Sequence, residues 1–239
     1  MGFELIIRET LSETYALYSC FYVIVIIIKE NKNMRILITA ITLSLLTGCA
    51  GHTEYSKEAF KRTDLHFIGI PTILGLGMTG SSVPITPEYS LTAAHVAKFM
   101  VYRVKAYHPT CDLALIYHKN NEVSYPTLRN SGMGENITMY GHSFISALPI
   151  ESNGKVLTNS TTINQWNKEA CPLYATSAGI VAGMSGGAVY NTQDNTLAGI
   201  VEGHAESINR DNKVVYKDTS LYVPYEQFDK WLIAELKGK

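Results

Sequence analysis

The chain has 239 residues, of which 46% are hydrophobic and 17% are charged, and its formal net charge is −1. This length and composition predict one globular domain with a sizeable core. The nearly neutral charge, with no cluster of lysine or arginine, argues against a nucleic-acid-binding protein, which needs a concentrated basic surface.

A secretory signal that ends in a lipid-modified cysteine is predicted near the N-terminus. Arg35 supplies a positive charge, and an apolar run over 36–46 follows that is too short to span a membrane. The small residues that lead into Cys49 resemble a bacterial lipobox. We therefore expect 34–48 to be a signal peptide, Cys49 to carry the lipid, and 49–59 to be a polar tether. The alternative is a buried helix that happens to end in Gly-Cys.

Residues 1–33 contain a second apolar stretch, over 21–28. It is either a short extra anchor or part of an upstream extension, with Met34 as the true start. A signal peptide works best at a chain terminus, which favours the extension. The lipid predicts a location in the cell envelope. Ala50 follows Cys49 in place of the aspartate associated with inner-membrane retention, so we expect the outer membrane.

Beyond the tether, short β-like runs alternate with turn residues. The runs are bounded by Gly, Pro, Asn or Ser and occupy 66–77, 102–108, 112–118, 136–144, 155–161 and 197–203. Their spacing predicts an all-β fold of antiparallel barrels or sandwiches. The turn-rich segment 130–136 is a natural hinge between two halves. The tail over 224–237 begins with a proline and places apolar residues at helical spacing, which predicts a terminal amphipathic helix.

Two cysteines remain once Cys20 is removed with the N-terminal extension and Cys49 is committed to lipid. In an exported chain, Cys111 and Cys171 are available to form a disulfide. The sequence leaves open the alternative of two buried free thiols.

A candidate nucleophile is Ser185, which lies between glycines in "GMSGGAV". A serine hydroxyl needs a positioned base, usually histidine, to take its proton. Among the histidines, only His95 has a suggestive context, "LTAAHV", in which small alanines precede the imidazole. Asp112 lies in "CDLALI", directly before an apolar strand-like run.

These three blocks resemble the catalytic blocks of trypsin-like serine peptidases, in that family's order of His, Asp and Ser. "LAGIVEG" resembles the strand that lines the substrate cleft, and "SLYVPYEQFDKWL" resembles the closing strand and terminal helix. The resemblance covers about 60–239. It implies two six-stranded-type antiparallel β-barrels and a C-terminal helix, the first barrel over about 60–129 and the second over about 137–223. His95 and Asp112 are close in sequence, so we expect the first barrel to be trimmed.

By position, the resemblance makes His95 the general base, Asp112 its orienting acid and Ser185 the nucleophile. The backbone N–H groups of Gly183 and Ser185 become the oxyanion hole. The implied activity is that of a serine endopeptidase acting on polypeptides, with no cofactor and no metal. A catalytically silent peptide-binding protein of the same fold is the alternative.

The resemblance also places the primary specificity pocket. Its lining residues are expected to be Gly179, Ile180, His204 and Ser220. No acid lies among them, so we expect a preference for a small or apolar side chain. Glu202 is expected to point to solvent at the rim of the cleft, although a position beside the triad acid is also open.

A rival interpretation of the G-x-S-x-G pattern is the nucleophile elbow of α/β hydrolases. That elbow needs a helix directly after the serine, with the acid and the histidine downstream. Here a strand, an Asn/Asp turn and a second strand follow Ser185, and too few residues remain for the rest of such a fold.

Overall fold

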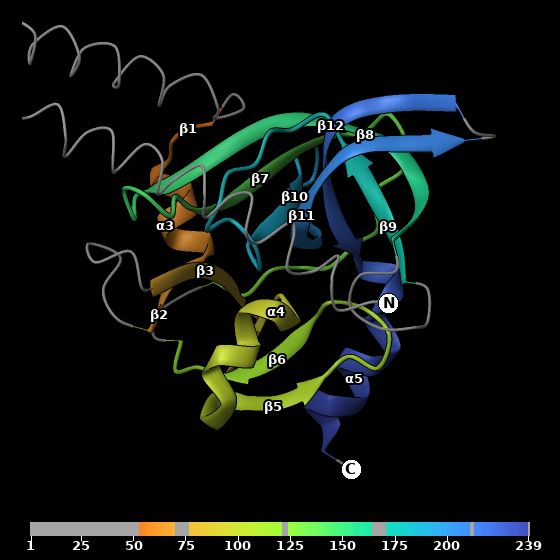
Figure 1. The fold of residues 1–239 in the computed structure, drawn as a ribbon. Coiled ribbons are helices and arrows are strands. Elements are labelled where there is room, and N and C mark those ends of the chain that lie inside the picture. Colours follow the sequence, from red (N-terminus) through yellow and green to blue (C-terminus); the bar gives the residue numbers. More distant parts are fainter. Residues whose placement is uncertain (1–52, 70–76, 121–123, 164–170, 211–212, 239) are drawn as a thin grey trace, which may run out of the picture. The chain divides into compact units, whose positions relative to one another are not determined.

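The computed structural model describes residues 53–69, 77–120, 124–163, 171–210 and 213–238 (Figure 1). These ranges belong to one unit of the chain, Ala50–Lys239. The expected extension and signal peptide and the lipidated Cys49 lie outside the described residues. Within the described ranges, no helix is long and apolar enough to cross a membrane.

Six antiparallel strands close into a barrel in the C-terminal part of the chain. They run in the order β8-β7-β10-β11-β12-β9, and β9 pairs back onto β8. Their bounds are β7 Asn136–His142, β8 Pro149–Ile163, β9 Cys171–Thr176, β10 Ala188–Asn191, β11 Leu197–Arg210 and β12 Lys213–Pro224. The interior is filled by side chains that alternate along these strands, Ile137 and Met139 of β7 among them, and both are fully buried.

A five-stranded sheet lies N-terminal to the barrel, in the order β2-β3-β4-β6-β5. Its strands are β2 Asp64–Gly69, β3 Gly77–Pro84, β4 Tyr89–Thr92, β5 Val104–Tyr107 and β6 Ala114–Tyr117. Between β4 and β5 the chain forms the short helix α4, Ala94–Ala97, and a 3₁₀ segment, Lys98–Arg103. The predicted all-β class is confirmed, and the trimmed first half has five strands.

The end of the expected tether is ordered rather than extended. Ser56 caps the helix α3, Lys57–Arg62, and its Oγ accepts a hydrogen bond of 3.1 Å from the N–H of Ala59, which is fully buried. Just before it, β1, Glu54–Tyr55, pairs with β8. The cap and the buried alanine attach the end of the segment expected to be a tether to the barrel.

The C-terminal helix α5 spans Asp229–Lys237 and follows a 3₁₀ turn at Tyr225–Gln227. The expected helix over 224–237 thus contains a turn before the α-helix begins. Asp229 in the first turn and Lys237 in the last turn complement the helix dipole. Phe228 and Leu232 are buried in the core and attach the helix to the domain.

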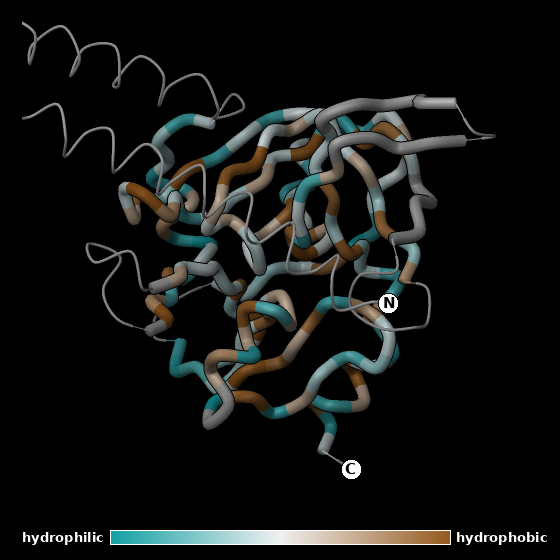
Figure 2. The backbone as a smooth tube through the Cα atoms, in the orientation of Figure 1, coloured by the Kyte–Doolittle hydropathy of each residue, from teal (hydrophilic) through white to brown (hydrophobic). Residues whose placement is uncertain are grey.

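One apolar core joins the five-stranded sheet, the barrel and α5. It contains Leu91 and Leu115 from the sheet, Ile200 and Leu221 from the barrel, and Phe228 beside α5. Figure 2 shows the apolar stretches along the strands, with hydrophilic residues towards the outside. Because the two halves share this core, a loop of the barrel can be held firmly against the sheet.

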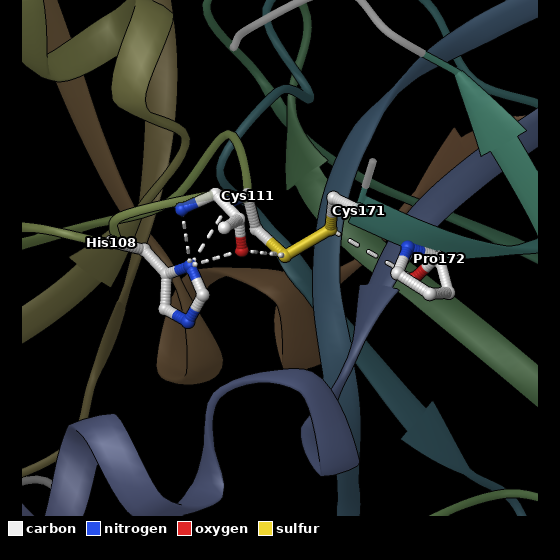
Figure 3. Close-up of a disulfide and its surroundings, with 5 residues drawn as sticks. His108, Cys111, Cys171 and Pro172 are labelled. Atoms are coloured by element: carbon white, nitrogen blue, oxygen red, sulfur yellow. Dashed lines mark hydrogen bonds between the residues drawn. A yellow bond between two sulfur atoms is a disulfide. The ribbon is translucent and has the colours of Figure 1, made fainter. Parts of the chain in front are cut away.

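A disulfide also links the two halves. Cys111, just before β6, is bonded to Cys171 at the start of β9, with an S–S distance of 2.06 Å and a Cα–Cα distance of 5.0 Å (Figure 3). This Cα–Cα separation is within the range that a bridge requires. The N–H of Cys111 also donates to Nδ1 of His108, at 2.9 Å. The residue next to Asp112 is therefore fixed on two sides.

Candidate active site

His95 and Asp112 form a doubly bonded pair in the five-stranded half. His95 lies on α4, and Asp112 lies in the turn that leads into β6. The backbone N–H of His95 donates to Oδ1 of Asp112 at 2.8 Å, and the ring Nδ1 bonds the other carboxylate oxygen. Asp112 is buried, whereas the His95 side chain is 38% exposed. The carboxylate thus fixes the imidazole while part of the ring remains accessible to solvent.

The charges around His95 favour its protonated form. Burial lowers the pKa of His95, but the hydrogen bond and the negative charge of Asp112 raise it, with a further contribution from Glu202. Lys98 acts in the opposite direction. The net result is a pKa above the ordinary value, as expected for a base whose cationic form is stabilised by a neighbouring carboxylate.

The loop that carries Ser185 packs against the segment that carries His95. A Cβ on Gly186 would lie 2.2 Å from Oγ1 of Thr92 and 2.9 Å from the nitrogen of Ala93, two residues before His95. The N–H of Ser81, on β3, donates to the carbonyl of Ser185 at 2.9 Å. The structure therefore brings the three predicted residues to one junction between the barrel and the five-stranded sheet.

The hydroxyl of Ser185 donates to the backbone carbonyl of Glu202, at 3.2 Å. Among the described residues, no hydrogen bond joins Ser185 to His95. Catalytic hydrogen bonds are often long or absent in a protein without substrate and form when substrate binds.

Two backbone N–H groups of the same loop are available to a ligand. In the described part of the chain, the N–H groups of Gly183 and Ser185 have no acceptor. Those of Met184 and Gly187 are bonded at 3.1 and 2.8 Å. Gly183 has φ +95°, and a Cβ there would lie 2.6 Å from the carbonyl oxygen of His142. This position requires glycine. The N–H groups of Gly183 and Ser185 are two donors with one residue between them.

Sequence reasoning missed the residue that supports this loop, Ser81. Its hydroxyl donates to the carbonyl of Gly183 at 2.9 Å and accepts from the N–H of His142 at 3.0 Å. Desolvation by burial lowers the pKa of His142 to about 4, so the imidazole behind the loop is neutral. Nothing in the sequence around Ser81 marks it, because its role depends on three segments that meet only in the fold.

The sequence predicts that Glu202 points to solvent, and this prediction is wrong. Glu202 is buried, with 7% of its surface exposed. Burial and the charge of Asp112 raise its pKa to about 7, and the charge of His95 acts in the opposite direction. Glu202 ends a run of buried residues on β11 that begins at Leu197, and it lies where the register of β11 against β12 shifts, between Val201 and Gly203.

The expected pocket residues lie around the end of β9. His204 and Ser220 are register partners on β11 and β12, and Ser220 also pairs with Thr176 of β9. Gly179 and Ile180 follow β9 in the loop that leads to Ser185, and both are half-buried. The N–H of Gly179 donates to Oγ of Ser152 at 2.8 Å. In the described ranges, no group of three or more His, Cys, Asp or Glu side chains is arranged to hold a metal ion.

Comparison with known proteins gives matches at the level of structure alone. No family model and no curated protein matches the sequence. The active form of the Rv3671c protease from M. tuberculosis aligns with a TM-score of 0.56 at 13% identity, covering 74% of this chain and 81% of that one. The serine endoprotease from Yersinia pestis aligns with a TM-score of 0.55 at 18% identity, covering 74% and 63%.

The HtrA-type protease AlgW, solved with a tripeptide, aligns with a TM-score of 0.55 at 18% identity, covering 73% of this chain and 60% of that one. All three are named as proteases. The chain therefore has the chymotrypsin-like fold of the trypsin-like serine proteases.

Proposed function

We propose that this protein is a serine endopeptidase in which His95 is the general base, Asp112 orients it and Ser185 is the nucleophile. The observation that carries the proposal is the doubly bonded His95–Asp112 pair beside the docked loop of Ser185. A carboxylate in this position stabilises the imidazolium that forms when the base takes the serine proton. The raised pKa of His95 agrees with that role.

The same loop supplies the electrostatic part of the mechanism. The N–H groups of Gly183 and Ser185, which have no acceptor among the described residues, bind the oxyanion of the tetrahedral intermediate. Losing one such donor typically costs about 10²–10³ in rate. Ser81 acts here as a support, since its hydroxyl holds the carbonyl of Gly183 away from the hole.

The substrate proposed is a polypeptide with a small or apolar side chain at the cleavage site. The buried Ser220 and the half-buried Gly179 and Ile180 offer no charge to a basic side chain, and His204 lies at the outer edge. The tripeptide bound by AlgW is consistent with a peptide ligand for this fold.

Export and a lipid on Cys49 complete the proposal. The signal-like sequence before Cys49 supports it, as does the disulfide, which is typical of an oxidising compartment. The mature protein should partition into detergent, and Cys49→Ser should abolish that behaviour. A soluble product that starts at Met1 contradicts this part of the proposal.

A fluorophosphonate probe tests the chemistry directly. The native protein should be labelled, and labelling should disappear in Ser185→Ala. As a matched control, Ser143→Ala removes a half-buried hydroxyl whose contacts lie within its own loop, and it should leave labelling unchanged. The second candidate is a silent peptide-binding protein, favoured by the bond from Ser185 to Glu202 in place of His95. An unlabelled native protein supports that candidate.

A further inference from the structure

Glu202 is a buried carboxyl beside the candidate active site that the proposed mechanism does not use. It lies on β11 next to the loop of the nucleophile: the flanking Val201 bonds Gly186 and Gly187, and the carbonyl of Glu202 itself accepts from Ser185. Figure 1 shows β11 between β10 and β12 in the barrel. Glu202 is therefore part of the same junction as the nucleophile.

Glu202 is the last residue of a continuous buried run on β11. The residues from Leu197 to Glu202 are all buried, because one face of this part of the strand lies in the core that joins the two halves and the other face in the cluster that contains Val201. The register of β11 with β12 shifts between Val201 and Gly203. The charged groups that act on the buried Glu202 carboxyl are Asp112 and His95.

Three ionisable groups thus share one partly buried site. Asp112 is bonded twice to His95, and burial together with the charge of Asp112 raises the pKa of Glu202. The pKa of His95 is influenced by Asp112, Glu202 and the exposed Lys98, which begins the 3₁₀ segment after α4. No hydrogen bond to the Glu202 carboxyl occurs in the described part of the chain, so its influence on His95 is through its charge.

We propose that Glu202 is a positioning residue that sets, through its own charge, how readily His95 accepts a proton. When Glu202 is neutral, His95 is the weaker base and remains unprotonated, and so competent, at lower pH. When Glu202 is ionised, the added negative charge makes His95 a stronger base. The two groups therefore titrate as a coupled pair rather than independently. The catalytic consequence rests on the proposed function, but the coupling itself does not.

The experiment is an NMR titration of the His95 ring in a Ser185→Ala background, with and without Glu202→Gln. Gln has the shape of Glu and no charge, so the His95 midpoint should fall by about one pH unit. Glu88→Gln, an exposed site, is the matched control and should not move the midpoint. An unchanged His95 midpoint in Glu202→Gln overturns the proposal.

A second measurement uses the wild-type chain, so its result does not depend on whether a variant folds. In the wild-type chain, the side-chain carboxyl carbons of glutamate are followed with pH. One should titrate near pH 7, where burial places Glu202, and the His95 ring should show an inflection at the same pH. If every glutamate titrates below about pH 6, the proposal is wrong. Neither readout requires activity. A failed fluorophosphonate test would therefore contradict the proposed peptidase function and leave the coupling between Glu202 and His95 unaffected.

Discussion

His95 uses its backbone N–H and its imidazole to bind the two different oxygens of Asp112. A carboxylate held at both oxygens fixes the tautomer of the ring. In Asp112→Asn one oxygen becomes an amide nitrogen, which cannot accept a hydrogen bond. We expect this variant to fold, to lower kcat/KM for peptide hydrolysis by about 10³–10⁴, and to lose the upward shift in the pKa of His95. Peptide hydrolysis and a histidine titration check these two results.

A second histidine–aspartate pair provides the control for this variant. Nδ1 of His118 lies 3.4 Å from Oδ2 of Asp64, in the same half of the molecule. Asp64→Asn removes the same charge away from the junction, and kcat/KM should be unchanged. Equal losses in the two variants would mean that Asp112 acts on stability alone.

The elements and residues that local sequence marks were predictable. The strand-like runs between turn residues identified β7 and β11, because alternation and Gly or Asn boundaries act over a few residues. His95, Asp112 and Ser185 were each found from a short motif. Their assembly into one junction follows from the order of the blocks in the resemblance and not from any local feature.

The features that the sequence did not reveal depend on contacts between distant segments. Ser81 supports Gly183 only because β3 passes behind the loop of the nucleophile. Glu202 is buried because both faces of β11 are covered by core residues up to this position, which depends on how the two halves pack. Ser56 was assigned to the tether because its capping role appears only once the helix packs on the barrel.

Gly186 is expected to be essential for the docking of the nucleophile loop. Its φ is +82°, and a Cβ would lie 2.2 Å from both the carbonyl of Ser81 and Oγ1 of Thr92. Gly186→Ala should lower the free energy of unfolding by about 3 kcal/mol or more, since backbone strain and a backbone clash add. Denaturant unfolding measures the loss.

A variant at Gly134 separates the contribution of backbone strain from that of the steric clash. Its φ is +84°, but a Cβ there meets nothing within 4 Å. Gly134→Ala should therefore cost only the strain of the left-handed backbone, about 1 kcal/mol. If both variants lose the same stability, the close contact of Gly186 with the sheet contributes nothing.

The disulfide is expected to stabilise the domain chiefly by restricting the unfolded chain. Cys111 and Cys171 are separated by 60 residues. On the chain-entropy model, closing such a loop contributes about 4 kcal/mol. The double variant Cys111→Ser, Cys171→Ser should lose up to that amount in denaturant unfolding, and reduction of the wild-type chain should give a similar loss. A double variant as stable as the oxidised protein contradicts this expectation.

The buried carboxyl of Glu202 should make stability fall as pH rises. Its pKa is about 7 in the folded protein, against an ordinary value of 4.5. Between these two values the folded state binds a proton that the unfolded chain releases, so the free energy of unfolding decreases through this window and stays low above it.

Glu202→Gln removes this titration. The variant should match the wild type near pH 4 and exceed it at pH 8, by up to about 3 kcal/mol at about 1.4 kcal/mol per pKa unit. Denaturant unfolding at both pH values, in a Ser185→Ala background that prevents self-digestion, measures the difference. Glu88→Gln, at an exposed site, should show no such dependence. A difference between Glu202→Gln and wild type that is the same at pH 4 and pH 8 would show that Glu202 does not hold a proton in the folded state.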